Sequence, residues 1–551
     1  MKRIAIIVLS IVLGLPIILF TLINIYGGAG RKTGDPMKPG NIEVPVQRTF
    51  IYNDTSALQQ KVISNWSEGK TEEWKENEKV NLKNSRTVLG CLVSGKRVDE
   101  MNQYLMRQKA TGVPGSNWWL NPNGDYDFNV MAFTPVLYMF DDRPDLLYPE
   151  TKAHLLKNIL TIEGEGFTKK VPYLLLEDTE NHILMAEGSR YLKNQWLWNN
   201  GERSPEYDNA TNGVEKGLKS YLEEIYTYGF YEYNSQPYLG YTYGALLNLD
   251  EFASGEIKAL SRKILDRLNW QYALSSYKFK HFPPYRRRFG KSFKTNIDSD
   301  YHTVMLKVWA SLYADTLVFE DISRGKHHAL WASIMSYRPP DKVMEWTIQK
   351  PCQYFVKMGH GYNSCAEIYS GDKSYLISSG GANQGKRSLI VAKPIMLFLD
   401  DDATEMDEAI HMYGPGEDFV EWNNTGVYED FACTKGKVHI PEGKQAVLAS
   451  DKWRAFGISE GVFLAVYSDK ELGIMIIVRA ASAEKALNKV IAINSDEDLL
   501  TTQFNHPNGN FIEYDLDSPK NKWVITKVNN ETVDRDFDQW PFFDGNIDGI
   551  N

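Results

Sequence analysis

Two adjacent polar side chains, Asn181 and His182, stand at the start of a predicted helix and are the first candidates for chemistry. Either Asp178 or Thr179 can cap this helix, because both side chains accept hydrogen bonds from first-turn N–H groups. Asn181 shares a helix face with Leu184 and other apolar residues, so its amide points inward. A buried amide needs a partner. That partner is either a substrate or a neighbouring helix, and the sequence leaves both open.

Two further stretches supply phenol and guanidinium groups. A polar, aromatic loop leads into a predicted helix that carries Tyr238, Tyr241 and Tyr243, and tyrosines at i and i+3 share one helix face. Prolines before Arg286 and Arg287 place these arginines in a predicted loop. Arginine binds a carboxylate or sulfate through two parallel hydrogen bonds. The tyrosines either bind substrate or serve aromatic packing between helices. The arginines either bind substrate or form a solvated basic loop.

Together these groups fit β-elimination across the glycosidic linkage of a uronic acid. The reaction removes a weakly acidic C5 proton, and neutralising the adjacent carboxylate lowers the barrier. Asn181, His182 and an arginine can neutralise that charge, while a tyrosine or histidine takes the proton and a tyrosine returns one to the leaving oxygen. A tyrosine with an ordinary pKa of about 10 needs a nearby cation to act as a base at neutral pH. These side chains fill every role, so we expect neither a metal nor an organic cofactor.

The stretch from about residue 50 to 340 must position these groups, and its pattern is helical. Apolar residues recur at i, i+3, i+4 and i+7 in the segments 98–110, 153–160, 180–198, 214–228, 241–252, 257–274, 301–318 and 326–337. Consecutive helical hairpins predict either a solenoid or a closed (α/α) toroid. The chain shows no fixed-period repeat, which argues against a regular solenoid.

Beyond about residue 345 the pattern changes to short β-rich runs separated by Gly, Asp and Asn. The predicted strands lie in 353–358, 374–379, 388–399, 461–468, 473–479, 489–493, 511–514 and 523–528. Such spacing is typical of an antiparallel sandwich or of stacked sheets. The expected fold is therefore multi-domain, α and then β.

An uncharged run at 4–26 precedes the helical region. It is long enough to span a membrane of about 30 Å, so we expect a single-pass anchor with the large domain exported; a cleaved signal peptide and secretion are the alternative. The expected organisation is an anchor or signal at 1–30, a linker at 31–50, a toroid at 51–343, a β-sandwich at 344–528 and an acidic tail at 529–551.

Composition narrows the classes of partner. The net charge is −10, and an acidic chain is a poor candidate for nucleic-acid binding. Aromatic residues make up 13%, including 31 Tyr and 14 Trp, which fits carbohydrate stacking on rings or an aromatic-rich core. No CxxC motif is present, which argues against zinc or redox motifs of that kind. Cys352 and Cys365 flank a likely hairpin and either pair or remain free thiols.

The Asn181–His182 pair and the tyrosines 56 to 61 residues after His182 resemble the alginate lyase and heparinase II/III-type polysaccharide lyases. The resemblance implies an (α/α) toroid followed by antiparallel β-sheets and a substrate that is an acidic polysaccharide. It implies catalytic roles for Asn181, His182, Tyr238 and Tyr241.

The match to this family departs at two positions. Where the family reads Pro-x-Leu-x-Arg, this chain reads Pro-Tyr-Leu-Gly-Tyr over 237–241, so the family's arginine is missing. The family has a tyrosine about two turns later, and in this chain that position falls near Leu246. Arg286 or Arg287 would replace the missing arginine from another segment and bind substrate together with Tyr243. Two residues of the β region, His360 and Tyr362, resemble family residues that face the cleft.

Three functions remain open from the sequence. The first is a membrane-anchored lyase on a uronate-containing glycan. The second is a catalytically inactive glycan-binding or envelope scaffold protein with the same fold. The third is a glycoside hydrolase, which needs two carboxylates in a cleft; the available acids are Glu177, Asp178, Glu180 and Glu232. The oligomeric state is not predicted.

Overall fold

The computed structural model describes residues 36–69, 82–110, 125–160, 169–170, 176–177, 179–236, 238–286, 295–319, 322, 328–360, 366–381, 390–391, 393–414 and 422–548, together with residue 14. The run at 4–26, expected to be an anchor or signal, lies outside these ranges apart from residue 14. Among the helices of the described residues, none is long and apolar enough to cross a membrane.

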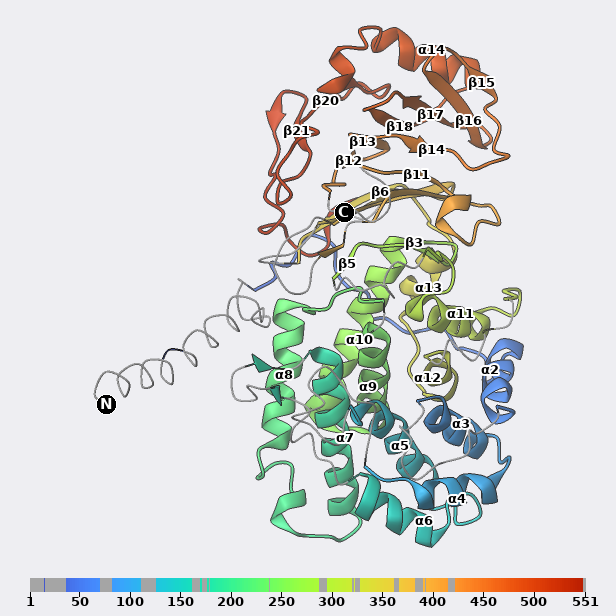
Figure 1. The fold of residues 1–551 in the computed structure, drawn as a ribbon, viewed down its shortest axis with the longest axis vertical. Coiled ribbons are helices and arrows are strands. Elements are labelled where there is room, and N and C mark those ends of the chain that lie inside the picture. Colours follow the sequence, from blue (N-terminus) through green and yellow to red (C-terminus); the bar gives the residue numbers. More distant parts are fainter. Residues whose placement is uncertain are drawn as a thin grey trace, which may run out of the picture.

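Helices form the first half of the chain (lower part of Figure 1). They are α2 (Ala57–Ser67), α3 (Leu82–Val93), α4 (Val98–Arg107), α5 (Asp127–Phe140), α6 (Pro149–His154) with the π-turn η2 (Leu155–Ile159), α7 (Glu180–Asn199), the 3-10 turn η3 (Pro205–Tyr207), α8 (Val214–Tyr228), α9 (Leu239–Phe252), α10 (Gly255–Ser275), α11 (Tyr301–Tyr313), α12 (Ala329–Ile334) and α13 (Asp341–Ile348). Both α11 and α12 contact α2. The last helices of this half thus return to the first.

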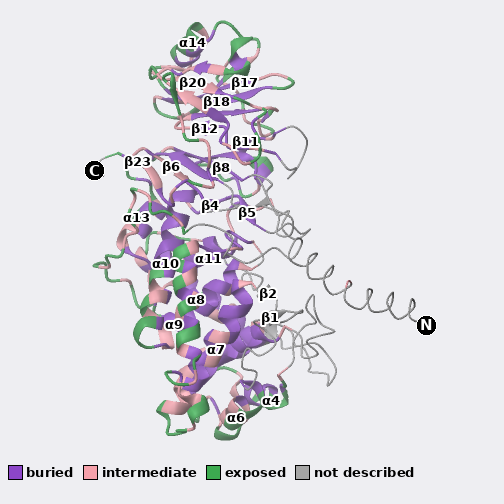
Figure 2. Cartoon of the chain, turned by 90° about the vertical axis from the view of Figure 1, so that its left-hand side faces the viewer, coloured by how far each residue is buried: buried purple, intermediate pink, exposed green. Residues whose placement is uncertain are grey.

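The way the helices of this half pack explains which of their faces are apolar. α5, α7 and α9 contact one another and bury most of their residues. α8 is amphipathic instead, and buries a single stripe of Val214, Leu218, Leu222 and Ile225. Figure 2 shows this contrast between buried and exposed helix faces.

Short strands interrupt the helical half, which the sequence pattern did not predict. They are β1 (Lys169–Lys170), β2 (Leu176–Glu177), β3 (Ser276–Tyr277), β4 (Lys280–His281) and β5 (Tyr285–Arg286). The prediction that Arg286 lies in a loop is wrong, because β5 pairs with β9 (Ile390–Val391) of the second half. Strands of two residues are too short to leave a periodicity in the sequence.

The second half consists of antiparallel sheets, as predicted. A seven-stranded sheet has the order β14-β11-β10-β8-β7-β6-β23, and a six-stranded sheet the order β12-β13-β18-β17-β16-β15. Their bounds are β6 (Tyr354–Met358), β7 (Glu367–Gly371), β8 (Tyr375–Gly380), β10 (Ile395–Leu399), β11 (Ile410–Met412), β12 (Val427–Tyr428), β13 (Phe431–Thr434), β14 (Val438–His439), β15 (Leu448–Ala449), β16 (Trp453–Ser459), β17 (Val462–Ser468), β18 (Gly473–Arg479) and β23 (Asp544–Ile547). A further sheet joins β19 (Gln503–Asn505), β20 (Phe511–Tyr514), β21 (Ile525–Val528) and β22 (Glu531–Thr532).

The seven-stranded sheet is buried on both faces, and β10 shows this most clearly. Its Ile395 and Leu397 belong to the core shared with the six-stranded sheet. Its Met396 and Phe398 belong to a core shared with α10 and α13 of the helical half. Because side chains alternate along a strand, a wholly apolar strand is what a sheet packed between two layers requires.

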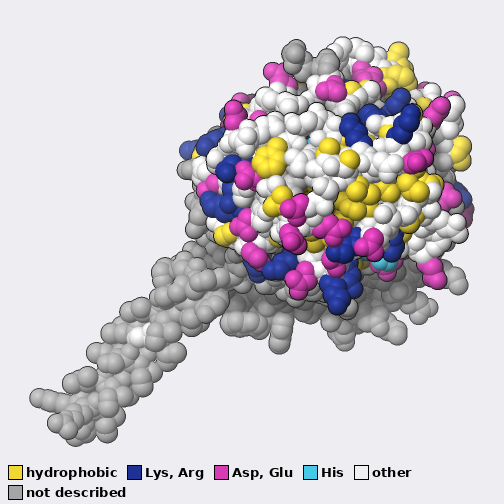
Figure 3. All heavy atoms as spheres, turned by 90° about the horizontal axis from the view of Figure 1, so that it is seen from above, with side chains coloured by type: hydrophobic (Ala, Val, Ile, Leu, Met, Phe, Trp, Pro, Cys, Tyr) yellow, Lys and Arg dark blue, Asp and Glu magenta, His cyan; other side chains and the backbone are white. Residues whose placement is uncertain are grey.

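One predicted strand of the second half is a helix in the structure, and residues of the predicted tail and linker meet at an edge of the seven-stranded sheet. The predicted strand at 489–493 is wrong, because these residues end helix α14 (Ala483–Ile493), which Ser482 caps by accepting from the Lys485 N–H at 3.2 Å. Within the tail at 529–551, β23 pairs with β6 at the sheet edge. The linker also joins this edge, since the Gly40 N–H donates to the Phe542 carbonyl at 2.8 Å. On the face that Figure 3 shows, basic and acidic side chains are interspersed.

Candidate functional site

Helices α5 and α7 bring a buried carboxylate to His182. Asp127 begins α5 and is 0% exposed, and its Oδ2 lies 2.7 Å from His182 Nδ1. A carboxylate only accepts hydrogen bonds, so Nδ1 carries the proton in this pair. Nε2 then holds the lone pair. The ring therefore has a fixed tautomer and orientation, which is what a histidine needs to take up a proton from a substrate.

Asn181 lies beside His182, and its side-chain oxygen and nitrogen differ in their hydrogen bonding. Its Oδ1 accepts from the Thr179 hydroxyl at 2.7 Å, so Thr179 stands at the N-cap without accepting from the helix. Its Nδ2 is buried and has no hydrogen-bond partner among the described residues. A buried donor without an acceptor costs about 1–3 kcal/mol. The prediction of an inward-facing amide is confirmed.

Tyr241 meets a guanidinium from α3. Its ring packs edge-on against Phe128, with centroids 4.6 Å apart, and Phe128 in turn packs against His182 at 5.2 Å. The Arg86 guanidinium lies 5.9 Å from the centre of the Tyr241 ring. Burial lowers the pKa of Arg86 to about 10, so it stays charged at neutral pH. Burial also raises the pKa of Tyr241, and the charge of Arg86 partly opposes that shift.

The other predicted tyrosines lie apart from each other. Tyr238 is half-buried at the N-terminus of α9, and electrostatically coupled to Tyr241. Tyr243 is 0% exposed, and its hydroxyl lies 2.6 Å from His302 Nε2 inside the helical core. Burial raises its pKa well above 10. Tyr243 therefore serves the core and offers no surface for the substrate binding expected of it.

Arg286 connects the junction of the two halves to the start of α7. Its guanidinium lies 4.6 Å from the centre of the Tyr231 ring and 5.5 Å from that of Tyr233. The Tyr231 N–H donates to Oε1 of Glu180, the residue before Asn181. The three stretches singled out in the sequence are thus linked in space.

A buried carboxylate on β7 holds the junction together. Glu367 is 0% exposed and lies 2.6 Å from His360 Nε2. It accepts from Asn234 Nδ2 at 2.8 Å and from Gln271 Nε2 at 3.1 Å, both from the helical half, and from the hydroxyl of Tyr369. Burial opposes its ionisation, but the charge and hydrogen bond of His360 outweigh it and hold the pKa of Glu367 below its usual value.

His360 reaches the helical half through this network. Its ring stacks on Tyr233 with centroids 4.1 Å apart. Arg287 and Tyr362, the remaining predicted substrate-binding residues, lie outside the described residues, as does Cys365. Cys352 is a free thiol whose pKa burial raises.

Sequence reasoning missed Arg86, Asp127 and Glu367. Asp127 had a readable signal, since it is the only charged residue of a largely apolar helix. Arg86 had a weaker one, because α3 also contains Lys83 and several polar residues. Glu367 had none, because its partners lie up to 133 positions away.

Comparison with protein-family models finds no match, and comparison with curated proteins finds none.

Proposed function

We propose that this chain is a polysaccharide lyase-like protein that cleaves a uronate-containing glycan by β-elimination. One observation carries the proposal: α5, α7 and α9 pack so that the rings of His182 and Tyr241 both contact Phe128, with Asp127 bound to His182 and Asn181 next to His182 in the chain. The return of α11 and α12 to α2 supports an (α/α) toroid as the scaffold.

Each group has a chemical role in this proposal. Nδ2 of Asn181 donates to the uronate carboxylate, whose charge grows as the C5 proton leaves. His182, oriented by Asp127, or Tyr238 takes that proton. Tyr241 returns a proton to the leaving glycosidic oxygen, because its raised pKa keeps the hydroxyl protonated at neutral pH.

The guanidinium of Arg86 substitutes for the arginine missing from the 237–241 segment. That arginine would stand at position 241, where this chain has tyrosine. Arg86 reaches the same place from α3, at 5.9 Å from the Tyr241 ring. Arg286, 7% exposed and stacked on Tyr231, acts in this proposal by holding the loop before α9.

The catalytically inactive alternative is favoured by one feature. Asn181 and His182 are 1% and 6% exposed, which leaves little of either side chain accessible to a glycan. A hydrolase has less support, because Glu180 is buried and its Oε1 accepts a hydrogen bond from the Tyr231 N–H. Location in a membrane through residues 4–26, with the large domain exported, is part of the proposal and is tested by fractionation of cells.

The test is turnover of acidic polymers. The purified chain is incubated with alginate, hyaluronan, heparin and pectin-like polymers, and formation of an unsaturated uronate is followed by ultraviolet absorbance. His182→Ala and Tyr238→Phe should each abolish the signal, while His154→Ala on α6 and Tyr226→Phe on α8 serve as controls and should retain it. New reducing ends without that absorbance would indicate hydrolysis. Binding without turnover would indicate the inactive scaffold.

A further inference from the structure

A pocket of about 640 Å³ opens where three sheets meet, and it takes no part in the site described above. β6 and β23 line it from the seven-stranded sheet, the turn between β12 and β13 from the six-stranded sheet, and β21 and β22 from the four-stranded sheet. β20 and β21 lie at the upper left of Figure 1. The volume falls within the range of about 300–1,000 Å³ that small-molecule sites occupy.

The pocket lies on the face of the seven-stranded sheet that is turned away from the helical half. Along β6, Tyr354, Val356 and Met358 belong to the core shared with that half. Phe355 and Lys357 alternate with them, so they point to the opposite face, and both line the pocket. The pocket is therefore separate from the junction that holds Arg286 and Glu367.

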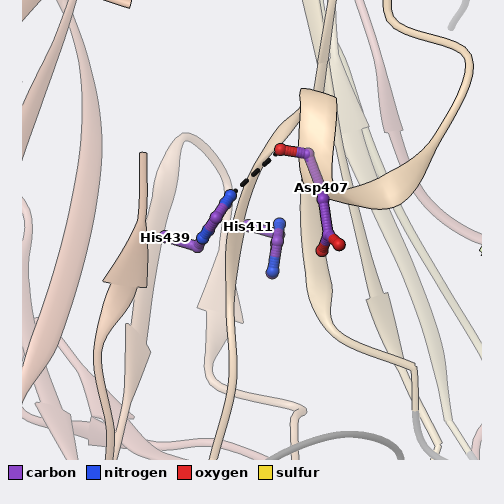
Figure 4. A group of neighbouring side chains, drawn as sticks. All are labelled: Asp407, His411 and His439. Atoms are coloured by element: carbon purple, nitrogen blue, oxygen red, sulfur yellow. Dashed lines mark hydrogen bonds between the residues drawn. The ribbon is translucent and has the colours of Figure 1, made fainter. Parts of the chain in front are cut away.

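The two edges of the seven-stranded sheet differ in what their side chains contact. At β11 and β14, His411 and His439 stack with ring centroids 4.3 Å apart, and His439 Nε2 donates to the Asp407 carbonyl at 3.0 Å (Figure 4). At β6 and β23, Lys357 and Asp544 are directly opposite partners, and Lys357 Nζ lies 3.9 Å from Asp544 Oδ2. Strand pairing thus places a cation and a carboxylate side by side in the pocket.

Three aromatic rings form the apolar part of the pocket. The ring centroids of Phe355 and Tyr428 are 5.5 Å apart, and those of Tyr428 and Trp523 are 6.4 Å apart. Trp523 is 2% exposed, and its indole N–H has no hydrogen-bond partner among the described residues. Phe355 and Tyr428 are half-buried, so part of each side chain stays accessible. Neighbouring rings of this kind offer an apolar surface on which the C–H face of a sugar can stack.

Glu429 stands in a conformation that glutamate rarely adopts. It has a φ of 48° in the turn between β12 and β13, a region that favours glycine and asparagine. Its Oε2 accepts from the amides of Asn508 and Asn510 at 3.5 Å, whereas such bonds are usually about 2.7–3.2 Å long. Burial and the charge of Asp430 raise the pKa of Glu429. A hydroxyl group that donates to this carboxylate would supply the short bond that it lacks within the described part of the chain.

The polar part of the pocket combines acceptors with donors. The charged residues that line it are Lys357, Glu429, Glu531, Asp534 and Asp544. Asparagine and threonine side chains beside them add further donors. A pocket with this excess of negative charge repels a uronate, and a simple cation would leave the donors without acceptors. A molecule rich in hydroxyl groups satisfies both kinds of group, because each hydroxyl donates and accepts.

We propose that this pocket binds an uncharged saccharide unit. One face of the sugar ring lies on Tyr428 and Phe355, and its hydroxyl groups hydrogen-bond to Glu429 and Lys357. The class of ligand differs from the uronate of the proposed lyase site, and the two sites lie on different faces of the seven-stranded sheet. This second site does not depend on the lyase activity, because none of its residues takes part in the elimination.

The test measures binding of neutral sugars to the full chain. Tetrasaccharides of glucose, mannose, xylose, galactose and N-acetylglucosamine are tested by saturation-transfer NMR and then titrated by calorimetry. We expect binding of a neutral tetrasaccharide, and neither a tetrasaccharide of uronic acid nor a tetralysine peptide should displace it. Displacement by tetralysine would show that the pocket serves a cation. That result, or the failure of all the neutral sugars to bind, overturns the proposal.

Variants locate the bound sugar. Tyr428→Ala removes a ring and should weaken binding about tenfold. Glu429→Gly should weaken it about tenfold as well, yet should not lower the unfolding temperature, because glycine adopts a φ of 48° without strain.

Two further variants are controls for these effects. Tyr226→Ala removes an exposed ring on α8, and His182→Ala removes the proposed base of the lyase site; both should bind the neutral sugar as the parent does. Unchanged binding in a Tyr428→Ala/Glu429→Gly double variant overturns the proposal. Turnover of acidic polymers should be equal in this double variant and the parent, so the failure of one site is distinguishable from the failure of the other.

Discussion

Removing the carboxylate of Glu367 should loosen the contact between the helical half and the sheets. This side chain accepts hydrogen bonds from Asn234, Gln271 and Tyr369 and pairs with His360. All of these partners are buried or nearly so. Glu367→Ala therefore removes one acceptor shared by four donors and leaves a cavity in its place.

The size of the effect follows from that count. An unsatisfied buried donor costs about 1–3 kcal/mol, and breaking a buried ion pair by removing one partner costs about 3–5 kcal/mol. Water entering the cavity recovers part of this cost. We expect Glu367→Ala to lower the free energy of unfolding by about 4 kcal/mol, and Glu367→Gln, which keeps an acceptor oxygen, by about half as much.

The pH dependence gives a second signature. The pKa of Glu367 is lower in the folded chain than the value of about 4.3 in an unfolded one. Its contribution is thus present above that value and is lost as the pH falls through the folded pKa. The parent should lose stability between neutral pH and acid, whereas Glu367→Gln should lose less over the same interval.

The assay is thermal unfolding of the parent and variants by calorimetry at several pH values. Glu68→Ala removes an exposed glutamate that pairs with a lysine and should change little. If Glu367→Ala melts within 1 °C of the parent at neutral pH, the network does not join the halves. The loop that carries Tyr231 and Tyr238 also depends on this network through Asn234, so turnover should fall with stability.

Three further predictions concern neighbouring contacts. Gly240→Ala should destabilise the chain by about 1–3 kcal/mol in calorimetry, because its Cβ would lie 2.5 Å from His328 Nε2. Asp300→Asn should lower stability by about 2 kcal/mol at neutral pH. Burial opposes ionisation of Asp300, but His281 outweighs it and holds the pKa of Asp300 well below its usual value. The variant should therefore lose less stability than the parent between pH 5 and 2. Arg86→Met should abolish turnover and Arg86→Lys should retain part of it; equal turnover in parent and Arg86→Met would remove this residue from the site.

How far the sequence predicted each element depended on whether its pattern was local. Helix α8 matches its predicted range, because four buried residues spaced three or four apart mark one face. The segment 489–493 failed because it is the last turn and a half of α14, and a short apolar run reads equally well as a strand. Extending the window to the Ser482 cap would have corrected it.

The residues of the candidate site also differ in whether a local pattern in the sequence marks them. Asn181 and His182 stood out because they are polar residues at the start of an apolar helix face. Their partner Asp127 is 55 positions away, and Glu367 is 133 positions from Asn234. Only the packing of whole helices and sheets creates such pairs. The sequence pattern identified the candidate residues Asn181 and His182 and could not identify the residues that orient them.

The proposed function assigns to Arg86 the role of the arginine that the 237–241 segment lacks. The chemistry requires a cation near the tyrosine and the substrate carboxylate, and it does not specify which helix supplies it. Position 241 is a tyrosine, and the guanidinium of Arg86 from α3 lies 5.9 Å from the centre of its ring. Burial lowers the pKa of Arg86, but only to about 10, so the guanidinium stays charged at neutral pH. A charge kept buried against Tyr241 and Trp331, 5.3 Å from the latter ring, is expensive for a scaffold that only needs packing. We therefore weigh the buried cation as support for an active site over an inactive one, and Arg86→Met decides between them.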